Sequence, residues 1–190
     1  MISLEYSRIN KIVEVGCGYS PISMSKVFWQ DISKKVILIE PNIFFYKNLL
    51  DEISKFSNIQ CYNCAIYDKN ELVNFFLVGQ SSYIEGVDSP LQTHLRGCAN
   101  VFYKRQKVVV PAFKIDFFDK KDIDYLIISN EGCEFFVLKY LISRPIFIFL
   151  QIYNLDGYKM PFSKEIFNWF NDNNYHIINR TSLGILLKRI

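Results

Sequence analysis

Short apolar runs alternate along the chain with longer segments in which apolar residues return at helical spacing. The runs are continuous and rich in Val, Ile and Leu, which is typical of strands buried on both faces of a parallel sheet. They cover residues 11–15, 35–40, 58–66, 123–129 and 145–153. The segments of helical period cover residues 20–33, 42–56, 131–143 and 163–174. This alternation predicts an α/β fold with a mainly parallel sheet.

Two parts of the chain depart from this alternation. Residues 175–181 and 184–189 predict a closing antiparallel hairpin around a short turn. Between residues 68 and 111 the helical rhythm stops, and 72–79 and 106–113 alternate weakly, as strands of an antiparallel excursion would. The long polar stretch between them is typical of a functional loop. We therefore predict one domain, residues 1–190, in which residues 68–111 form an insertion or lid.

Capping signals predict where two of the helices begin. Ser20 is expected to cap the first helix, with Pro21 at the first helical position, where proline is tolerated. Ser163 is expected to cap the last helix. Phe162, Ile166 and Phe170 have the spacing of a core-facing side of that helix.

The composition agrees with one packed domain. The 190 residues are 50% hydrophobic and 22% charged, which suits a buried core and excludes a disordered chain. No apolar run reaches the roughly 18–20 residues of a membrane helix, and residues 1–11 lack the pattern of a secretion signal. The net charge of +3 comes from scattered Lys and Arg, not from a basic stripe. We expect a cytoplasmic protein that binds neither membrane nor nucleic acid.

The five cysteines do not predict a metal site. Cys61 and Cys64 have the spacing of a metal-binding pair, and His94 precedes Cys98 by four residues. A second pair of this spacing is missing, however, and Cys61 falls in a predicted strand. We therefore expect reduced, buried thiols and no metal.

The stretch 10–25, NKIVEVGCGYSPISMS, joins the first predicted strand to the first predicted helix through a glycine turn. Such a turn brings backbone N–H groups and a helix N-terminus close to a bound nucleotide. The dinucleotide fingerprint needs a third glycine where this chain has Pro21. Glu14, two residues before Gly16, would repel a pyrophosphate. It suits a ligand with an ammonium group, directly or through water.

A second acidic residue agrees with a cofactor that has no phosphate. Glu40 ends the second predicted strand, about 22 residues after Gly18, where a carboxylate can accept both hydroxyl hydrogens of a ribose. That feature alone is shared with NAD sites. Together with Glu14 and Pro21 it favours S-adenosyl-L-methionine (SAM), which has an α-amino group, a sulfonium and a ribose. The alternative, a solvated strand-end glutamate beside a turn that only reverses the chain, stays open.

The chain resembles FkbM-type class I SAM-dependent methyltransferases from about Lys11 to Arg189, and four segments carry the resemblance. Residues 13–23, VEVGCGYSPIS, are similar to the family's glycine-loop motif, and 36–42, VILIEPN, to its acidic second-strand motif. Residues 63–69, NCAIYDK, fall at the family's adenine-contacting loop. Residues 125–138, YLIISNEGCEFFVL, resemble the family's Lys-Ile-Asp-Val-Glu-Gly-Ala-Glu segment. The first two motifs are generic to class I methyltransferases, and the last is the more specific one.

The resemblance implies a single-domain Rossmann-like class I methyltransferase fold. Its sheet would be seven-stranded and mainly parallel, with a C-terminal antiparallel hairpin and a central insertion. The implied cofactor is SAM, with Cys17 and Cys64 contributing by backbone position and not by thiol chemistry. The expected cofactor-binding residues are Glu14, Gly16, Cys17, Gly18, Ser20, Glu40, Pro41, Asn42, Cys64, Ala65 and Ser82.

Glu131 and His94 are the catalytic candidates. Glu131 follows the fourth parallel strand at its C-terminal end, where ligands lie in open α/β sheets, and it is the first candidate for a base. The alternative is a carboxylate favoured only by a helix N-terminus. His94 falls in the long polar stretch and titrates near neutrality, so it could also serve as a base. Its alternative is an exposed residue without a role.

We therefore expect a methyltransferase that acts on a small-molecule acceptor, with O-methyl transfer favoured over N-methyl transfer. The resemblance alone suggests a hydroxyl of a sugar or glycan precursor. The family's lysine and aspartate are replaced by Ile127 and Ser129, and its third glycine by Ser20. These departures leave open an inactive protein of the same fold that supports a partner subunit. An NAD-dependent oxidoreductase is a third reading, and the aromatic content is compatible with a homo-oligomer.

Overall fold

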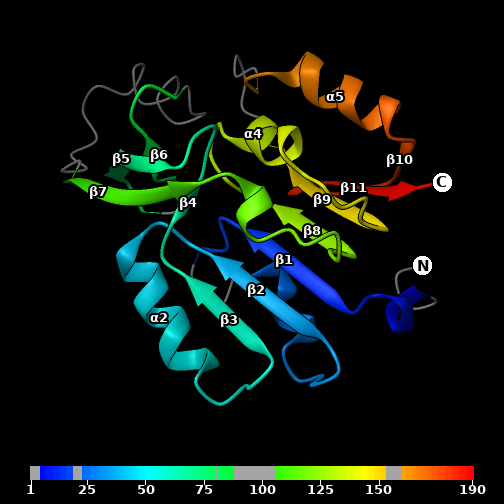
Figure 1. Cartoon of the computed structure of the whole chain (residues 1–190), viewed down its shortest axis with the longest axis horizontal. Helices are drawn as coiled ribbons and strands as arrows, with labels where there is room; N and C mark the ends of the chain where they lie inside the picture. The colour runs from blue at the N-terminus through cyan, green and yellow to red at the C-terminus, as the bar shows by residue number, and fades with distance from the viewer. Residues whose placement is uncertain (1–4, 19–22, 80, 88–105, 153–159) are drawn as a thin grey trace.

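The computed structural model describes residues 5–18, 23–79, 81–87, 106–152 and 160–190. Its centre is a seven-stranded sheet with the strand order β10-β11-β9-β8-β1-β2-β3 (Figure 1). The strands are β1 (Lys11–Val15), β2 (Lys35–Ile39), β3 (Ile59–Tyr62), β8 (Tyr125–Ile128), β9 (Phe147–Gln151), β10 (Tyr175–Arg180) and β11 (Gly184–Arg189). The neighbours from β9 to β3 are all parallel, and β11 lies antiparallel between β9 and β10. The mainly parallel sheet and the closing hairpin predicted from the sequence are confirmed.

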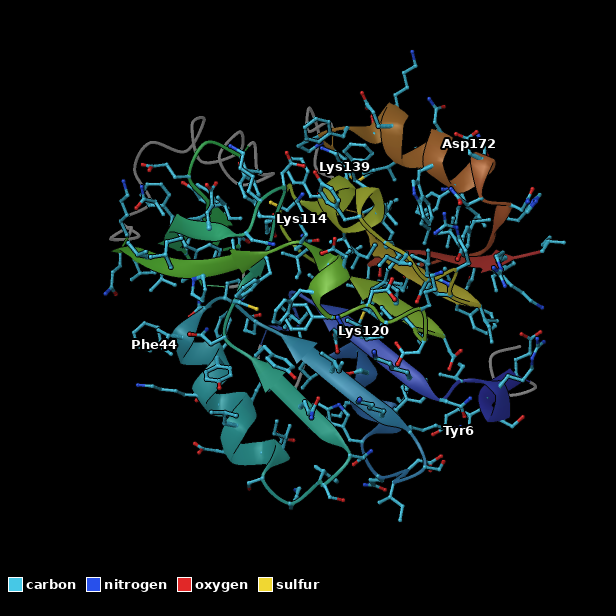
Figure 2. All side chains as sticks on the ribbon, viewed as in Figure 1. Tyr6, Phe44, Lys114, Lys120, Lys139 and Asp172 are labelled. Carbon is cyan, nitrogen blue, oxygen red and sulfur yellow. The ribbon has the colours of Figure 1, made fainter. Side chains whose placement is uncertain are left out.

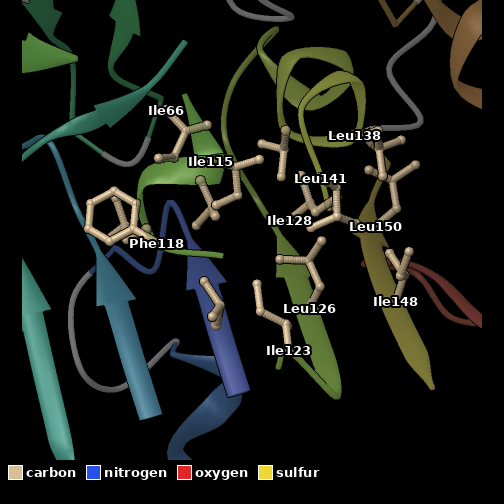
Figure 3. Close-up of a cluster of buried hydrophobic side chains, with 14 of the residues drawn as sticks. Ile66, Ile115, Phe118, Ile123, Leu126, Ile128, Leu138, Leu141, Ile148 and Leu150 are labelled. Atoms are coloured by element: carbon tan, nitrogen blue, oxygen red, sulfur yellow. The ribbon is translucent and has the colours of Figure 1, made fainter. Parts of the chain in front are cut away.

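Apolar residues at alternate strand positions build a core on each face of this sheet. Val13 and Val15 belong to one buried cluster, whereas Ile12 of the same strand belongs to the other. All positions of β1 are buried, which explains why this run is continuous instead of alternating. Figure 3 shows the first cluster, in which Leu126 of β8 and Leu138 from the following helix take part.

A second sheet is formed mainly by the described part of the predicted insertion, with β4 just before it. Its strand order is β4-β7-β5-β6, with β4 (Ala65–Ile66), β5 (Glu71–Leu77), β6 (Tyr83–Ile84) and β7 (Gln106–Phe113). β5 and β7 pair antiparallel, as their weak alternation predicts. The run 58–66, predicted as one strand, is divided: β3 joins the main sheet and β4 joins the second one. The division into a single domain with a lid at 68–111 stays a prediction.

Contacts of Asp68, just after β4, join the second sheet to the helix that follows β8. Lys139 Nζ donates to Asp68 Oδ1 at 2.6 Å, and the hydroxyl of Tyr140 donates to the same oxygen at 2.9 Å. Lys114, which directly follows β7, lies with its Nζ 4.2 Å from the centroid of the Tyr140 ring. Lys114 and Lys139 mark this junction in Figure 2. The two sheets are thereby held together beside the carboxyl ends of the parallel strands.

Three α-helices are present in the described residues: α2 (Ile43–Ile53), α4 (Glu134–Lys139) and α5 (Ser163–Asp172). The apolar pattern predicts each of them, but with more residues than the structure gives. Asn42 caps α2, because its Oδ1 accepts a hydrogen bond of 3.0 Å from the N–H of Phe44. None of the described helices is long and apolar enough to cross a membrane.

The cap predicted for α5 is wrong. Ser163 is already helical, and the residue before it, Phe162, has a left-handed backbone (φ 57°) without a side-chain cap. Ile166 and Phe170 are buried as predicted, whereas Phe162 is 42% exposed. Phe162 stacks on Phe135 of α4 instead, with ring centroids 5.4 Å apart. Ring stacking on α4, and not burial in the core, therefore holds the Phe162 side chain. Helical spacing alone does not predict such a contact.

The helix predicted over 20–33 is, in its described part, a short 3-10 helix, Met24–Phe28. The predicted cap, Ser20, lies outside the described residues, as does Pro21. Glu14 of β1 accepts hydrogen bonds from the N–H groups of Met24 (2.8 Å) and Ser25 (3.0 Å) at the start of this helix. A buried side chain from the neighbouring strand thus satisfies its orphan donors.

Candidate functional site

A cavity opens at the carboxyl ends of the parallel strands. The ends of β1 and β2 and the chain directly after β8 form part of its wall, and β5 and β6 of the second sheet form another part. β2 and β3 lie on one side of β1, whereas β8 and β9 lie on the other, so the strand order reverses between β1 and β8. Ligands of open α/β sheets bind at such a point. The hollow has a volume of about 710 Å³ when the open space at its mouth is included.

The glycine loop after β1 lines this cavity through Gly16 and Gly18. Both have a left-handed backbone, with φ of 75° and 63°, a conformation that glycine adopts without strain. Gly16 also leaves no room for a side chain, because a Cβ there would lie 2.7 Å from the carbonyl oxygen of Ser129. The loop therefore needs glycine at Gly16 both for its turn and for the approach of the chain after β8.

Glu14 is not part of the cavity wall, although the sequence suggested that it faces a ligand. Its side chain is 1% exposed. Oε1 accepts from Met24 N–H, and Oε2 accepts from the hydroxyl of Ser23 at 2.7 Å and from Ser25 N–H. Burial raises the pKa of this carboxyl, while these hydrogen bonds lower it. In this geometry Glu14 fixes the chain that follows the glycine loop.

Glu40 lies at the end of β2 and lines the cavity. It is 4% exposed. Its Oε2 accepts a hydrogen bond of 2.7 Å from Gly18 N–H, and its Oε1 accepts one of 2.8 Å from Asn42 N–H. Burial raises the pKa of Glu40 to about 8, although both hydrogen bonds lower it. The carboxyl group is thus held in place by the loops after β1 and β2.

Asn42 connects the cavity wall to the second sheet. Its Nδ2 donates to the Oγ of Ser82 at 3.2 Å. Ser82 in turn donates to the carbonyl of Gly79 at 2.7 Å and accepts from Val78 N–H at 3.0 Å. Ser82 lines the cavity and Asn42 stands behind it. The two residues therefore fix the turn between β5 and β6 against the start of α2.

Of the remaining predicted cofactor residues, some line the cavity and one lies behind its wall. Pro41, Cys64 and Ala65 line the cavity, whereas Cys17 does not. Cys17 is buried, and its Sγ donates to the carbonyl of Ile39 at 3.6 Å. Burial raises the pKa of the Cys64 thiol to about 12, which disfavours thiolate chemistry.

The chain after β8 supplies polar residues to the side of the cavity opposite Glu40. Ser129, Asn130 and Glu131 all line the cavity, and Glu131 is 6% exposed. Glu134, at the start of α4, is 3% exposed, and its Oε1 accepts from Gly132 N–H at 3.3 Å. Burial raises the pKa of Glu134 to about 8, and the charge of Glu131 adds to this. The structure thus brings Glu131 and Glu40 into one cavity.

The sequence did not point to Asn130, Phe45 or Phe75. Phe75 of β5 and Tyr83 of β6 line the cavity, and so does Phe45 of α2. Phe75 occupies a buried position in an alternating strand. The alternation therefore predicts that its side chain is buried, but it does not predict that Phe75 lines this cavity. Nothing in the sequence marks Asn130 as a site residue, because the motif around it is recognised by its neighbours Ser129 and Glu131.

Some residues singled out in the sequence fall on undescribed parts of the chain. His94 and Ser20 lie outside the described residues, and so does Cys98, which follows His94 by four residues. The described residues contain no group of three or more His, Cys, Asp or Glu side chains placed to hold a metal ion. The expectations for His94 and Ser20 stay predictions.

The fold and the cavity define the class of protein. A seven-stranded sheet whose last strand lies antiparallel between its neighbours, with a glycine loop and an acidic β2 end, is a Rossmann-like SAM-dependent methyltransferase fold. Residues 17–177 match the model of the Methyltransferase FkbM domain. The chain belongs to the FkbM methyltransferase family, and its cofactor is SAM.

Solved structures of methyltransferases resemble the chain at low identity. Precorrin-6y C5,15-methyltransferase from Geobacter metallireducens GS-15 is 13% identical, with a TM-score of 0.48, over 99% of this chain and 86% of its own. The methyltransferase domain of bacterial CtHen1-CN is 10% identical, with a TM-score of 0.48, over 100% and 95%. M. jannaschii TYW2 in complex with AdoMet is 12% identical, with a TM-score of 0.43, over 96% and 70%. No curated protein matches the chain.

Proposed function

We propose that the protein transfers a methyl group from SAM to a hydroxyl of a small-molecule acceptor, a sugar or glycan precursor. The observation that carries this proposal is that Glu40, after β2, and Glu131, after β8, line one cavity on either side of β1. In this proposal one carboxyl group holds the cofactor and the other takes a proton from the acceptor. The sugar acceptor comes from the FkbM resemblance.

The residues of the β1–β2 side fit SAM. Each oxygen of Glu40 accepts one backbone N–H, which leaves lone pairs for the two hydroxyl hydrogens of a ribose. Gly16 and Gly18 let the backbone come close to a ligand. Cys64 and Ala65 offer small apolar contacts for the adenine. Bound SAM supplies a methyl group that its sulfonium has already activated.

The residues of the β8 side suit the acceptor. The acceptor hydroxyl would lose its proton as the new O–C bond forms and the S–C bond breaks, and in this proposal the Glu131 carboxylate takes that proton. The products are the methylated acceptor and S-adenosylhomocysteine. Phe75 and Tyr83 of the second sheet give the cavity an apolar wall that limits water around the reacting atoms.

An inactive protein that supports a partner subunit is the second candidate. It is favoured by Ile127, which is fully buried in β8 where the family segment has a lysine. Ser129 lines the cavity where that segment has an aspartate. Binding of the cofactor without methyl transfer, together with a stable partner complex, would support this candidate.

Calorimetry and product analysis test the main proposal. S-adenosylhomocysteine should release or absorb heat on titration into the purified protein, and NADH should not. No heat at millimolar S-adenosylhomocysteine would contradict cofactor binding. Methylated products from a panel of glycosides and amino sugars should then carry the methyl group on oxygen. A product methylated on nitrogen would overturn the O-methyl assignment and keep the cofactor assignment.

A further inference from the structure

Asn130, in the wall of the cavity, is a polar residue whose side chain has no hydrogen-bond partner in the described part of the chain. Its side-chain Oδ1 and Nδ2 are both hidden from solvent, and neither has a partner among the described residues. Asn130 directly follows Ser129 and precedes Glu131, and all three line the cavity. A donor and an acceptor therefore stand unpaired beside the proposed base.

An unpaired buried amide is costly to the folded protein. Burial removes water from both amide atoms, and the lost hydration is not replaced. Most buried polar side-chain atoms in proteins have a partner, so an exception calls for an explanation such as a ligand. The family segment resembled by residues 127–134 has valine at this position, which would fill the space without that cost. The amide of Asn130 is a feature of this chain.

The chemistry of the amide defines the group that would satisfy it. Nδ2 donates and Oδ1 accepts, and the two atoms are held side by side on a planar group. Two neighbouring hydroxyls of a polyol match this pair, because one hydroxyl oxygen accepts from Nδ2 while the other hydroxyl donates to Oδ1. A carboxylate or phosphate matches only half of the pair, since it has no hydrogen to donate to Oδ1.

The position of Asn130 assigns it to the acceptor. The cofactor contacts proposed for Glu40 and Gly18 lie at the ends of β2 and β1. Asn130 follows β8, on the other side of β1, next to Glu131. We infer that Asn130 binds two neighbouring hydroxyls of an uncharged polyol acceptor and thereby positions one of them for methylation. This inference rests on the proposed function and narrows its acceptor to a molecule with an intact vicinal diol.

Binding of methyl glycosides to the full chain tests the inference. The probes are methyl glycosides with vicinal diols and their monodeoxy counterparts, each titrated in the presence of saturating S-adenosylhomocysteine. Asn130→Leu keeps the branched shape of the side chain and removes both polar atoms. At least one diol glycoside should bind the wild type about tenfold more tightly than the variant. Its monodeoxy counterpart should bind both proteins equally.

Asn58→Leu is the matched control. Asn58 is also half-buried, but its Nδ2 donates to the carbonyls of Asp31 (3.1 Å) and Lys34 (3.0 Å), and Asn58 does not line the cavity. Asn58→Leu should lower the melting temperature and leave glycoside binding unchanged. Asn130→Leu should leave the melting temperature unchanged or raise it, because it removes an unpaired amide. A clear loss of stability in Asn130→Leu would show a structural role and overturn the inference.

The other possible results distinguish a failure of this inference from a failure of the proposed function. If Asn130→Leu lowers the affinity for S-adenosylhomocysteine itself, Asn130 contacts the cofactor and the inference is wrong. If no diol glycoside binds the wild type, or the variant binds it equally well, the inference is also wrong, whether or not the protein transfers methyl groups. If a diol binds in an Asn130-dependent way without turnover, the inference stands and the proposed catalysis fails.

Discussion

The backbone N–H of Gly18 donates a hydrogen bond of 2.7 Å to Oε2 of Glu40, across 22 residues of sequence. This bond ties the glycine loop after β1 to the carboxyl end of β2. The second oxygen of Glu40 is held by Asn42 N–H at the start of α2. A ribose entering the cavity would therefore meet a carboxyl group that is already oriented, which reduces the cost of ordering it on binding.

Replacing Glu40 should weaken cofactor binding. Glu40→Ala removes the proposed acceptor of two ribose hydroxyl hydrogens, and we expect a loss of about 1–3 kcal/mol in S-adenosylhomocysteine affinity by calorimetry. Glu85→Ala is the control, since Glu85 is an exposed glutamate paired with Lys107 at 2.8 Å. Equal affinities in the wild type and Glu40→Ala would remove Glu40 from the site.

A side chain at Gly16 should destabilise the protein more than one at Gly86. Both glycines have a left-handed backbone, with φ of 75° and 84°. A Cβ at Gly16 would lie 2.7 Å from Ser129 O, whereas one at Gly86 would meet nothing within 4 Å. Gly86→Ala should cost about 1–2 kcal/mol from the backbone alone. Gly16→Ala should cost more, measured as the free energy of unfolding in urea, and a smaller cost would contradict the close approach.

Much of the fold could be predicted because burial leaves a direct trace in the sequence. Strands buried on both faces, such as β1 and β8, read as continuous apolar runs. The role of Glu14 could not be predicted, because its partners Met24 and Ser25 come close only when the chain after the loop folds back on β1. The spacing of Glu14 before Gly16 is the same for a ligand contact and for a structural one.

The candidate site could be predicted where local sequence fixes it and not where tertiary contacts do. Gly16, Gly18 and Glu40 follow from strand ends and turn geometry, and all three line the cavity. Phe75 and Asn130 reach the same cavity from elements far apart in the sequence. Phe75 reaches the cavity only because the second sheet packs beside the strand ends, whereas Asn130 lies at a strand end but has no charge or motif that marks it in the sequence.

Glu14→Gln should destabilise the fold without acting on a ligand directly. The carboxylate of Glu14 accepts hydrogen bonds from three groups of residues 23–25, two of them backbone N–H. An amide has one accepting oxygen, so at least one buried donor loses its partner, and we expect a loss of about 1–3 kcal/mol in unfolding free energy. Glu52→Gln, at a partly exposed residue paired with Lys26, is the control and should cost less than about 1 kcal/mol. An unchanged unfolding free energy in Glu14→Gln would show that these hydrogen bonds of Glu14 do not stabilise the fold.

The stability of the protein without ligand should fall as the pH rises from about 5 to 8. Burial raises the pKa values of Glu40 and Glu134 from 4.5 to about 8. The folded protein therefore holds protons in this range that the unfolded chain has released, and this stabilisation is lost as the pH passes through the folded pKa. The melting temperature should be several degrees lower at pH 8 than at pH 5. Glu134→Gln should make this dependence shallower, and an identical slope would contradict a raised pKa for Glu134.

Glu131→Gln should separate proton transfer from cofactor binding. Glu131 lines the cavity after β8, whereas Glu40, proposed to hold the ribose, lies at the end of β2 on the other side of β1. S-adenosylhomocysteine affinity should therefore change less than about twofold, while the loss of a base should reduce methyl transfer about 10²–10⁴-fold. Glutamine keeps the size of the side chain, so a fall in transfer without a change in melting temperature reports lost chemistry and not lost packing. Transfer at the wild-type rate would reduce Glu131 to a carboxylate near the start of α4, and the proton of the acceptor would then have to leave by another group.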